Sequence, residues 1–146
     1  MKISVHNRQR TARVNLAWLR QVAEAAVAKC LSHSADGRFA LRELDEVEVS
    51  IVSDRVIAAV HLRFMNIPGA TDVITFEHGE IIMSAQTAQS YGASYGHSVD
   101  EELALYIIHG LLHLNGYEDA TAKEATAMRR VQERILRACL AQVSPL

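Results

Sequence analysis

The spacing of apolar residues along the chain follows two periods. Alternation at every second position, as in Glu46–Ser53 (EVEVSIVS), is typical of a half-buried strand. Recurrence at every third or fourth position, as in Val14–Leu31, is typical of an amphipathic helix. Together with short apolar runs, these periods predict strands at Lys2–Asn7, Glu46–Ser53, Asp72–Phe76 and Glu80–Ser84, and helices at Val14–Leu31 and from Asp54 to about Met65.

Turn and capping residues set the limits of these elements. Asp54 is expected to cap the second helix, and Asn66–Gly69 is expected to end it. Ser32–Arg38, which contains Asp36-Gly37, is expected to form a turn. His78-Gly79 separates the last two strands, which are expected to pair.

Helix signals dominate the second half of the chain. Ser98 and Glu101 form a capping box, and the helix that it opens is expected to run to about Leu114. Asn115-Gly116 is a stop signal of the left-handed type, and a final helix is expected from about Thr121 to Leu140. The order of elements predicts an α+β or α/β sandwich, of which we favour the α+β form, with a small mixed β-sheet of which one face is covered by helices.

Length and composition indicate one domain over residues 1–146. The chain is 49% hydrophobic, which excludes a disordered protein. No apolar stretch approaches the roughly 18 residues of a membrane span, and the first residues lack the apolar core of a signal peptide. Cys30 and Cys139 cannot form a disulfide framework and are expected to be buried thiols, so a cytoplasmic location is expected. Because the net charge is −2, any contact with nucleic acid must rest on a local basic patch.

An HxxxH pair on the first helix of the second half carries the candidate chemistry. Four helical residues turn through about 400°, so His109 and His113 project from one face and could share a divalent ion. Gly116 lets the chain reverse, which would return Glu118 or Asp119 toward the same ion. Such pairs are common in helices without a metal, but the apolar flanks bury this helix, and buried imidazoles need partners. Three protein ligands would leave a position for water, as in catalytic sites.

The segment around these histidines, HGLLHLNGYED, resembles the signature of the YbeY family, zinc-dependent endoribonucleases of bacterial ribosomal RNA maturation and ribosome quality control. The family pattern is His-Gly-x-Leu-His-Leu-x-Gly-Tyr-Asp-His, followed at a fixed distance by a methionine. The matching residues are His109, Gly110, Leu112, His113, Leu114, Gly116, Tyr117 and Met128. A second block, Thr71–Phe76 followed by Gly79–Ile81, resembles the family's Thr-Asp-Val-Leu-Ser-Phe and Gly-Asp-Ile.

The resemblance implies a zincin-like domain that acts as a metal-dependent endoribonuclease on single-stranded RNA. It implies one Zn²⁺ ion, or another divalent transition metal, held by His109, His113 and a third ligand. The family has a histidine as this third ligand where the chain has Asp119, and an aspartate where it has Glu118; a carboxylate is also a zinc ligand. The implied partners are ribosomal RNA and the small ribosomal subunit, with no role for DNA or a membrane.

Two further residues are candidates for catalysis. Glu80, near a strand end, is the outside carboxylate best suited to proton transfer, and His78 beside it is a candidate to line the same cleft. The family has an arginine that engages RNA phosphate where this chain has Met65. Arg63 is the candidate substitute, although a displacement of two helical residues turns it by about 200°. The methionines expected in the core are Met65, Met83 and Met128.

Two other functions remain open. The departures at Met65 and Asp119 are compatible with a catalytically weak or inactive protein that keeps the fold and associates with the ribosome or its RNA. Another zinc hydrolase, such as a peptidase, is the second alternative. Peptidases with the HExxH motif carry a glutamate directly after the first histidine, where this chain has Gly110, so the pattern disfavours them.

Overall fold

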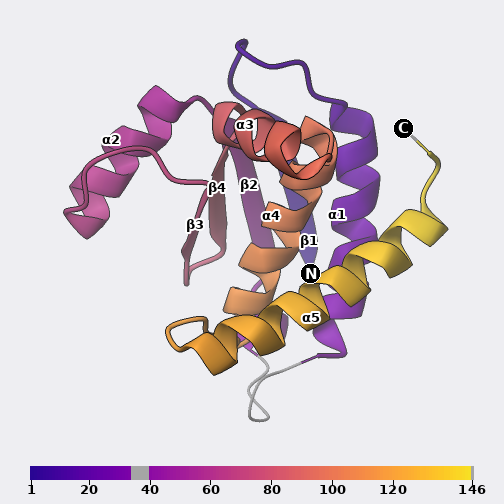
Figure 1. Cartoon of the computed structure of the whole chain (residues 1–146). Coiled ribbons are helices and arrows are strands. Elements are labelled where there is room, and N and C mark those ends of the chain that lie inside the picture. The colour runs from indigo at the N-terminus through magenta and orange to yellow at the C-terminus, as the bar shows by residue number, and fades with distance from the viewer. Residues whose placement is uncertain (34–39, 146) are drawn as a thin grey trace.

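A computed structural model describes residues 1–33 and 40–145 of the chain (Figure 1). The described residues form four strands, five α-helices and one 3-10 helix. In chain order these are β1 (Lys2–Asn7), α1 (Leu16–Leu31), η2 (Ala40–Glu43), β2 (Glu46–Val52), α2 (Asp54–Met65), β3 (Val73–Phe76), β4 (Glu80–Ser84), α3 (Ala85–Tyr95), α4 (Val99–Leu114) and α5 (Ala122–Gln142). Most of the turn predicted at Ser32–Arg38 lies outside the described residues.

The four strands form one mixed sheet in the order β1-β2-β4-β3. β1, β2 and β4 are parallel, and β3 pairs antiparallel with β4 at the edge. Val49 on β2 lies opposite Val5 on β1 and Ile81 on β4, so a row of buried apolar residues crosses the sheet. The prediction of a small mixed sheet covered by helices is therefore confirmed.

Helices lie on both sides of this sheet, not on one face alone as predicted, because α2 packs in a smaller cluster apart from the main core. The main core joins one face of the sheet to the buried sides of α1 and α4, with further residues from α3 and α5. On the other side, Ile57 of α2 packs with Ile74 and Ile82 in a smaller cluster. Figure 1 shows α2 standing apart from the other helices, beside β3 and β4. Because α4 contacts β3 and β4, the helix that carries the histidine pair runs close to this edge of the sheet.

Three details of the predicted elements are wrong. Ser53, not Asp54, caps α2, and Asp54 is its first helical residue. Both residue types are good caps, so the sequence does not rank two neighbours. Asn15 caps α1, which therefore begins at Leu16. Met65, expected in the core, is 43% exposed.

One helix, α3, is absent from the sequence-based prediction. Its buried residues are Ala85, Ala88 and Gly92, which are too small to produce a visible apolar stripe. Gly92 lets α3 approach the start of α4, because a Cβ there would lie 2.6 Å from the carbonyl oxygen of His97. Close backbone approach therefore replaces large apolar side chains in this contact.

Both cysteines are buried free thiols, as predicted. Burial raises the pKa of Cys30 and of Cys139, so both stay protonated near neutral pH. No helix in the described part of the chain is both long and apolar enough to cross a membrane.

Side chains and a glycine define the two ends of α4. Ser98 and Glu101 form the predicted capping box at its start. At its other end Gly116 has a φ of 97°, a left-handed conformation that favours glycine. The chain reverses there, and the N–H of Tyr117 donates to the carbonyl oxygen of Leu112 at 3.0 Å.

Asn115 ties the end of α4 to two other segments. Its side chain is buried, with 0% exposure. The amide NH₂ donates to the backbone carbonyls of Cys30 (2.8 Å) and His33, and the amide oxygen accepts from the N–H of Leu41 (3.3 Å). A buried polar group left without a partner costs roughly 1–3 kcal/mol, so one side chain satisfies three groups that need partners.

Asn115→Asp should destabilise the protein by at least about 2 kcal/mol, because a carboxylate cannot donate to the carbonyls of Cys30 and His33. Equilibrium unfolding in urea measures the change. Asn7→Asp is the matched control, because Asn7 is exposed and its amide oxygen accepts from Gln9 at 2.9 Å, a role that a carboxylate keeps. The control should change stability by less than about 0.5 kcal/mol. Equal losses in the two variants would contradict the role of Asn115.

Candidate metal centre

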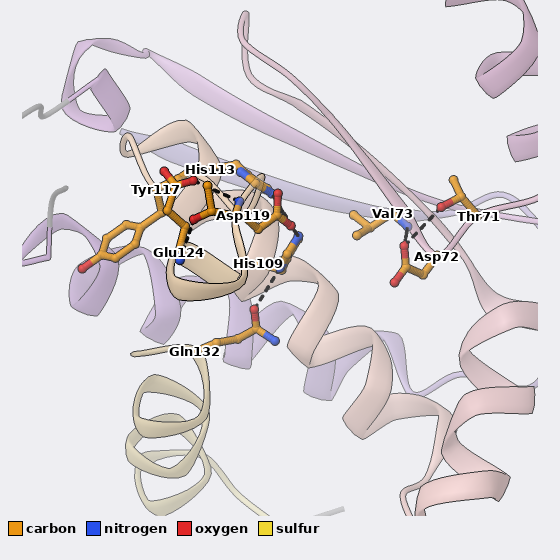
Figure 2. A network of polar contacts seen from close by, with 10 residues as sticks. Thr71, Asp72, Val73, His109, His113, Tyr117, Asp119, Glu124 and Gln132 are labelled. Atoms are coloured by element: carbon orange, nitrogen blue, oxygen red, sulfur yellow. Dashed lines mark hydrogen bonds and ion pairs between the residues drawn. The ribbon is translucent and has the colours of Figure 1, made fainter. Parts of the chain in front are cut away.

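Three potential metal ligands converge at the end of α4 (Figure 2). The Nε2 atoms of His109 and His113 are 3.0 Å apart. The chain reversal at Gly116 brings back Asp119, whose Oδ2 lies 3.6 Å from each of these nitrogens. Among the residues that the structure describes, this is the one group of three such side chains close enough to hold a metal.

Hydrogen bonds on the far side of each ring orient both imidazoles. The Nδ1 of His113 lies 2.9 Å from the backbone carbonyl oxygen of Tyr117, and the Nδ1 of His109 lies 2.9 Å from the side-chain oxygen of Gln132 on α5. Because these oxygens only accept, Nδ1 carries the proton in both rings and each Nε2 keeps its lone pair. Burial lowers the pKa of His109, which further favours the neutral ring that metal binding requires.

This set of donor atoms fits a divalent transition metal. Two imidazole nitrogens and a carboxylate oxygen are the ligands of several catalytic zinc sites. Ligands roughly 2.1 Å from one tetrahedral ion lie about 3.4 Å apart, close to the observed 3.0 and 3.6 Å. Two lone pairs at 3.0 Å repel each other unless a cation or proton lies between them. With three protein ligands, a fourth position would remain for water or a phosphate oxygen.

The ligand cluster lies where two cavities meet. The first cavity, of about 350 Å³, is lined by residues of α2 and β3 together with His109 and His113. The second, of about 270 Å³, is lined by His109 and Asp119 together with residues of α4 and α5. The side chains of the two histidines are 25% and 27% exposed and that of Asp119 is 46% exposed, so solvent reaches the cluster.

The predicted catalytic residues Glu80 and Arg63, and His78 beside Glu80, lie outside these two cavities. The carboxylate of Glu80 contacts Nε2 of His78 at 3.2 Å, and both line a separate small cavity at the start of β2 and β4. Arg63 is exposed, and its guanidinium carbon lies 5.3 Å from the ring centroid of Phe64. The structure therefore does not bring Glu80, His78 or Arg63 together with the histidine pair.

Of the two candidate carboxylates, the structure brings Asp119 to the histidines. Glu118 lines the first cavity, but its carboxylate is not part of the ligand group. Met65 also lines the first cavity, which accounts for its exposure: its side chain covers the cavity wall instead of entering the core.

Two residues that the sequence pattern does not reveal lie beside the cluster. His61 of α2 lines the first cavity, and its Nδ1 donates to the carbonyl of Gly69 at 2.9 Å, so its Nε2 keeps a lone pair. Asp72, before β3, lines the second cavity, and one of its carboxylate oxygens accepts from the N–H of Val73 at 2.7 Å (Figure 2). No fixed spacing links either residue to the histidine pair; the resemblance of Thr71–Phe76 is the one signal that marked Asp72.

Gly110 packs α4 against the sheet directly behind the histidines. A Cβ at this position would lie 2.6 Å from Cδ1 and 2.9 Å from Cγ1 of buried Ile81, and 3.1 Å from Oγ1 of Thr75. A glutamate has no room here, so the general base that HExxH peptidases carry at this position cannot be present. The packing therefore argues against a peptidase of that type.

The chain is similar to known endoribonucleases. A family model described as Endoribonuclease YbeY matches residues 4–139. Proteins named Endoribonuclease YbeY include one from Mycobacterium tuberculosis, 32% identical over 123 residues (68% of this chain and 70% of the relative), and one from Heliobacterium modesticaldum, 31% identical over 117 residues (64% and 70%). The solution structure of a Thermotoga maritima protein has a TM-score of 0.63 at 21% identity, over 95% of this chain and 91% of that one, and shares the fold.

His113→Ala should lower the affinity for zinc by more than about 100-fold, because even the outer partners of a metal ligand contribute about 10–100-fold. Titration with Zn²⁺ and the metal content of the purified protein measure the loss. His78→Ala is the control, because this exposed imidazole lies outside the cluster. Zinc retained by His113→Ala, or lost equally from the control, would exclude the proposed ligands.

Proposed function

Because this chain belongs to the YbeY endoribonuclease family, we propose that it is a metal-dependent endoribonuclease that cuts single-stranded RNA. One observation carries the metal dependence: His109, His113 and Asp119 direct their ligand atoms at one point between two cavities. The family supports the class of reaction, and the separation of the donor atoms supports the ion.

One Zn²⁺ ion per chain is the proposed metal. Nitrogen and carboxylate ligands suit zinc, and other divalent transition metals accept the same set. When bound, the ion would polarise a phosphoryl oxygen and lower the pKa of a bound water toward ~7. Asp119 is anionic, so the ion would be a weaker Lewis acid here than with a third histidine.

The chain itself supplies orientation and a proton acceptor. The contacts of Gln132 and Tyr117 hold the two metal-facing rings in place. The attacking oxygen, from water or the 2′-hydroxyl of RNA, must lose a proton. We assign the acceptor to Nε2 of His61, because this ring lines the first cavity and Gly69 fixes its tautomer. Glu80 faces a different cavity and is less suited to this step.

Ribosomal RNA is the proposed substrate and the small ribosomal subunit the proposed partner, in RNA maturation and ribosome quality control in the cytoplasm. The resemblance of Thr71–Phe76 and His109–Tyr117 to the two family blocks supports this role. With a net charge of −2, the chain would meet RNA through local basic surfaces, and neither DNA nor a membrane is part of the proposal.

A catalytically inactive protein bound to ribosomal RNA is the second candidate. Met65 favours it, because an apolar side chain lines the first cavity at the position where the resembling family carries an arginine. Arg63 does not replace that arginine, since its guanidinium lies over Phe64.

The zinc-loaded protein should cleave single-stranded RNA, and His109→Ala should abolish cleavage, because it removes a ligand of the ion that activates water and phosphate. A chelator should have the same effect, and added Zn²⁺ should restore activity. His78→Ala, outside both cavities, is the control. Cleavage that survives His109→Ala would exclude this centre; RNA bound but not cut by the zinc-loaded wild type would favour the inactive alternative.

His61→Gln should lower kcat by about 10²–10⁴-fold, because glutamine keeps a donor for Gly69 but is not a base. Zinc content should stay unchanged, since His61 is not in the ligand group. Single-turnover cleavage measures the change, with His78→Gln as control. An unchanged rate would show that His61 is not the proton acceptor. Glu80→Gln would then test whether Glu80 accepts the proton.

A further inference from the structure

A third cavity adjoins the second cavity and leads away from the metal centre. It has a volume of about 860 Å³, and residues of α3, α4 and α5 line it. It shares Asp72, Tyr106 and Gln132 with the second cavity, which contains His109 and Asp119. The two cavities therefore form one continuous groove that begins at the metal centre, which we call the α3–α5 groove. The third cavity falls in the range of about 300–1,000 Å³ typical of ligand sites.

α5 gives this groove a basic wall. The helix carries five of the 15 lysines and arginines and two acidic residues, in a chain of net charge −2. Arg129 and Arg137 line the groove, and Glu133 lies between them, about one helical turn from each. Within the described residues, no carboxylate lies at ion-pair distance from either guanidinium. Unpaired guanidinium groups are suited to phosphate, which they bind through two parallel hydrogen bonds.

α3 gives the groove an aromatic wall. Tyr91 is 47% exposed and Tyr95 is 74% exposed, and both line the groove. Their spacing of four residues places them on the same face of the helix. Exposed aromatic rings beside a basic wall form the combination by which proteins hold single-stranded nucleic acids: bases stack on the rings and phosphates meet the cations.

The floor of the groove is polar. Within the described residues the Oη of Tyr106 is buried without a hydrogen bond of good geometry, and burial together with the nearby carboxylate of Glu102 raises the pKa of this phenol. A polar ligand that reaches the floor would give the hydroxyl a well-placed partner. Glu102, also on the floor, is held by His97 at 2.9 Å. Carboxylates at this depth suit the amino groups of bases, which leaves the phosphates at the α5 rim.

We propose that the α3–α5 groove binds the single-stranded RNA on one side of the cleavage point, with bases stacked on Tyr91 and Tyr95 and phosphates paired with Arg129 and Arg137. The assignment of this strand as the substrate rests on the proposed function. The affinity of the groove for a single strand does not, because it follows from the two walls alone.

Fluorescence anisotropy with a short single-stranded RNA of mixed sequence tests the proposal, using the full chain with its metal removed by a chelator so that the RNA stays intact. The double variant Arg129→Ala/Arg137→Ala should bind more weakly. The plot of log K against log salt concentration should also become less steep, its negative slope decreasing in magnitude by about 1.4. Each phosphate contact of a single strand contributes about 0.7 to this magnitude. Tyr95→Ala should weaken binding by about 5- to 100-fold through lost stacking, and Tyr95→Phe should retain it.

Arg130→Ala/Arg134→Ala is the matched control. Both arginines are exposed on α5 and neither lines the groove, so the change in charge is the same at a different place. This control should leave the salt slope unchanged and the affinity within about twofold, since screening acts over ~8 Å at physiological salt. Equal effects of the two arginine pairs, or binding unaffected by Tyr95→Ala, would overturn the proposal.

Cleavage by the zinc-loaded protein is measured separately. The groove variants should raise KM and leave kcat unchanged. A wild-type chain that binds RNA through the groove but cuts none would refute the proposed function and leave the groove intact. A chain that cuts RNA while the groove variants bind and cut normally would refute the groove and leave the function intact.

Discussion

Two imidazole lone pairs held 3.0 Å apart are the constraint on which the rest of this site depends. Each ring is fixed from behind, His113 by the carbonyl of Tyr117 and His109 by the amide oxygen of Gln132. Neither ring can change its tautomer to relieve the repulsion without losing that hydrogen bond. A cation between the rings relieves it, and the nearby carboxylate of Asp119 offsets part of the charge. The arrangement of these three side chains therefore suits a divalent metal ion.

The fold maintains this arrangement by fixing α4 along its length. Gly110 sets the distance from α4 to the sheet, Asn115 joins its end to α1 and η2, and Gly116 turns the chain back. Because the ligands lie at the end of a buried helix, they occupy the boundary between the core and two cavities. In a chain of net charge −2, α5 carries five basic residues, of which Arg129 and Arg137 line the groove that leads away from the site.

Local patterns predicted most of the fold. The alternation in β2, the capping box of α4 and the glycine stop at Gly116 each depend on residues within a few positions of one another, and all three are confirmed. α3 was not predicted because its buried residues are Ala85, Ala88 and Gly92. These small residues let the backbones of neighbouring elements pack closely, and they leave no apolar stripe in the sequence. Met65 was misplaced for a related reason: hydrophobicity alone does not distinguish a core residue from one that lines a cavity.

The residues of the site also fall into those that local sequence patterns predicted and those that only the tertiary structure brought together. The sequence by itself determined that His109 and His113 share one face of a helix and that a carboxylate follows a chain reversal, because helical geometry and a glycine turn are local properties. Only the tertiary structure decided that Asp119 completes the group and Glu118 does not, since the path of the turn depends on what it packs against. Contacts between segments distant in the chain also brought in the remaining partners of the site, His61, Asp72 and Gln132. Such contacts have no period along a sequence, because they arise from the packing of α2, β3 and α5 around α4.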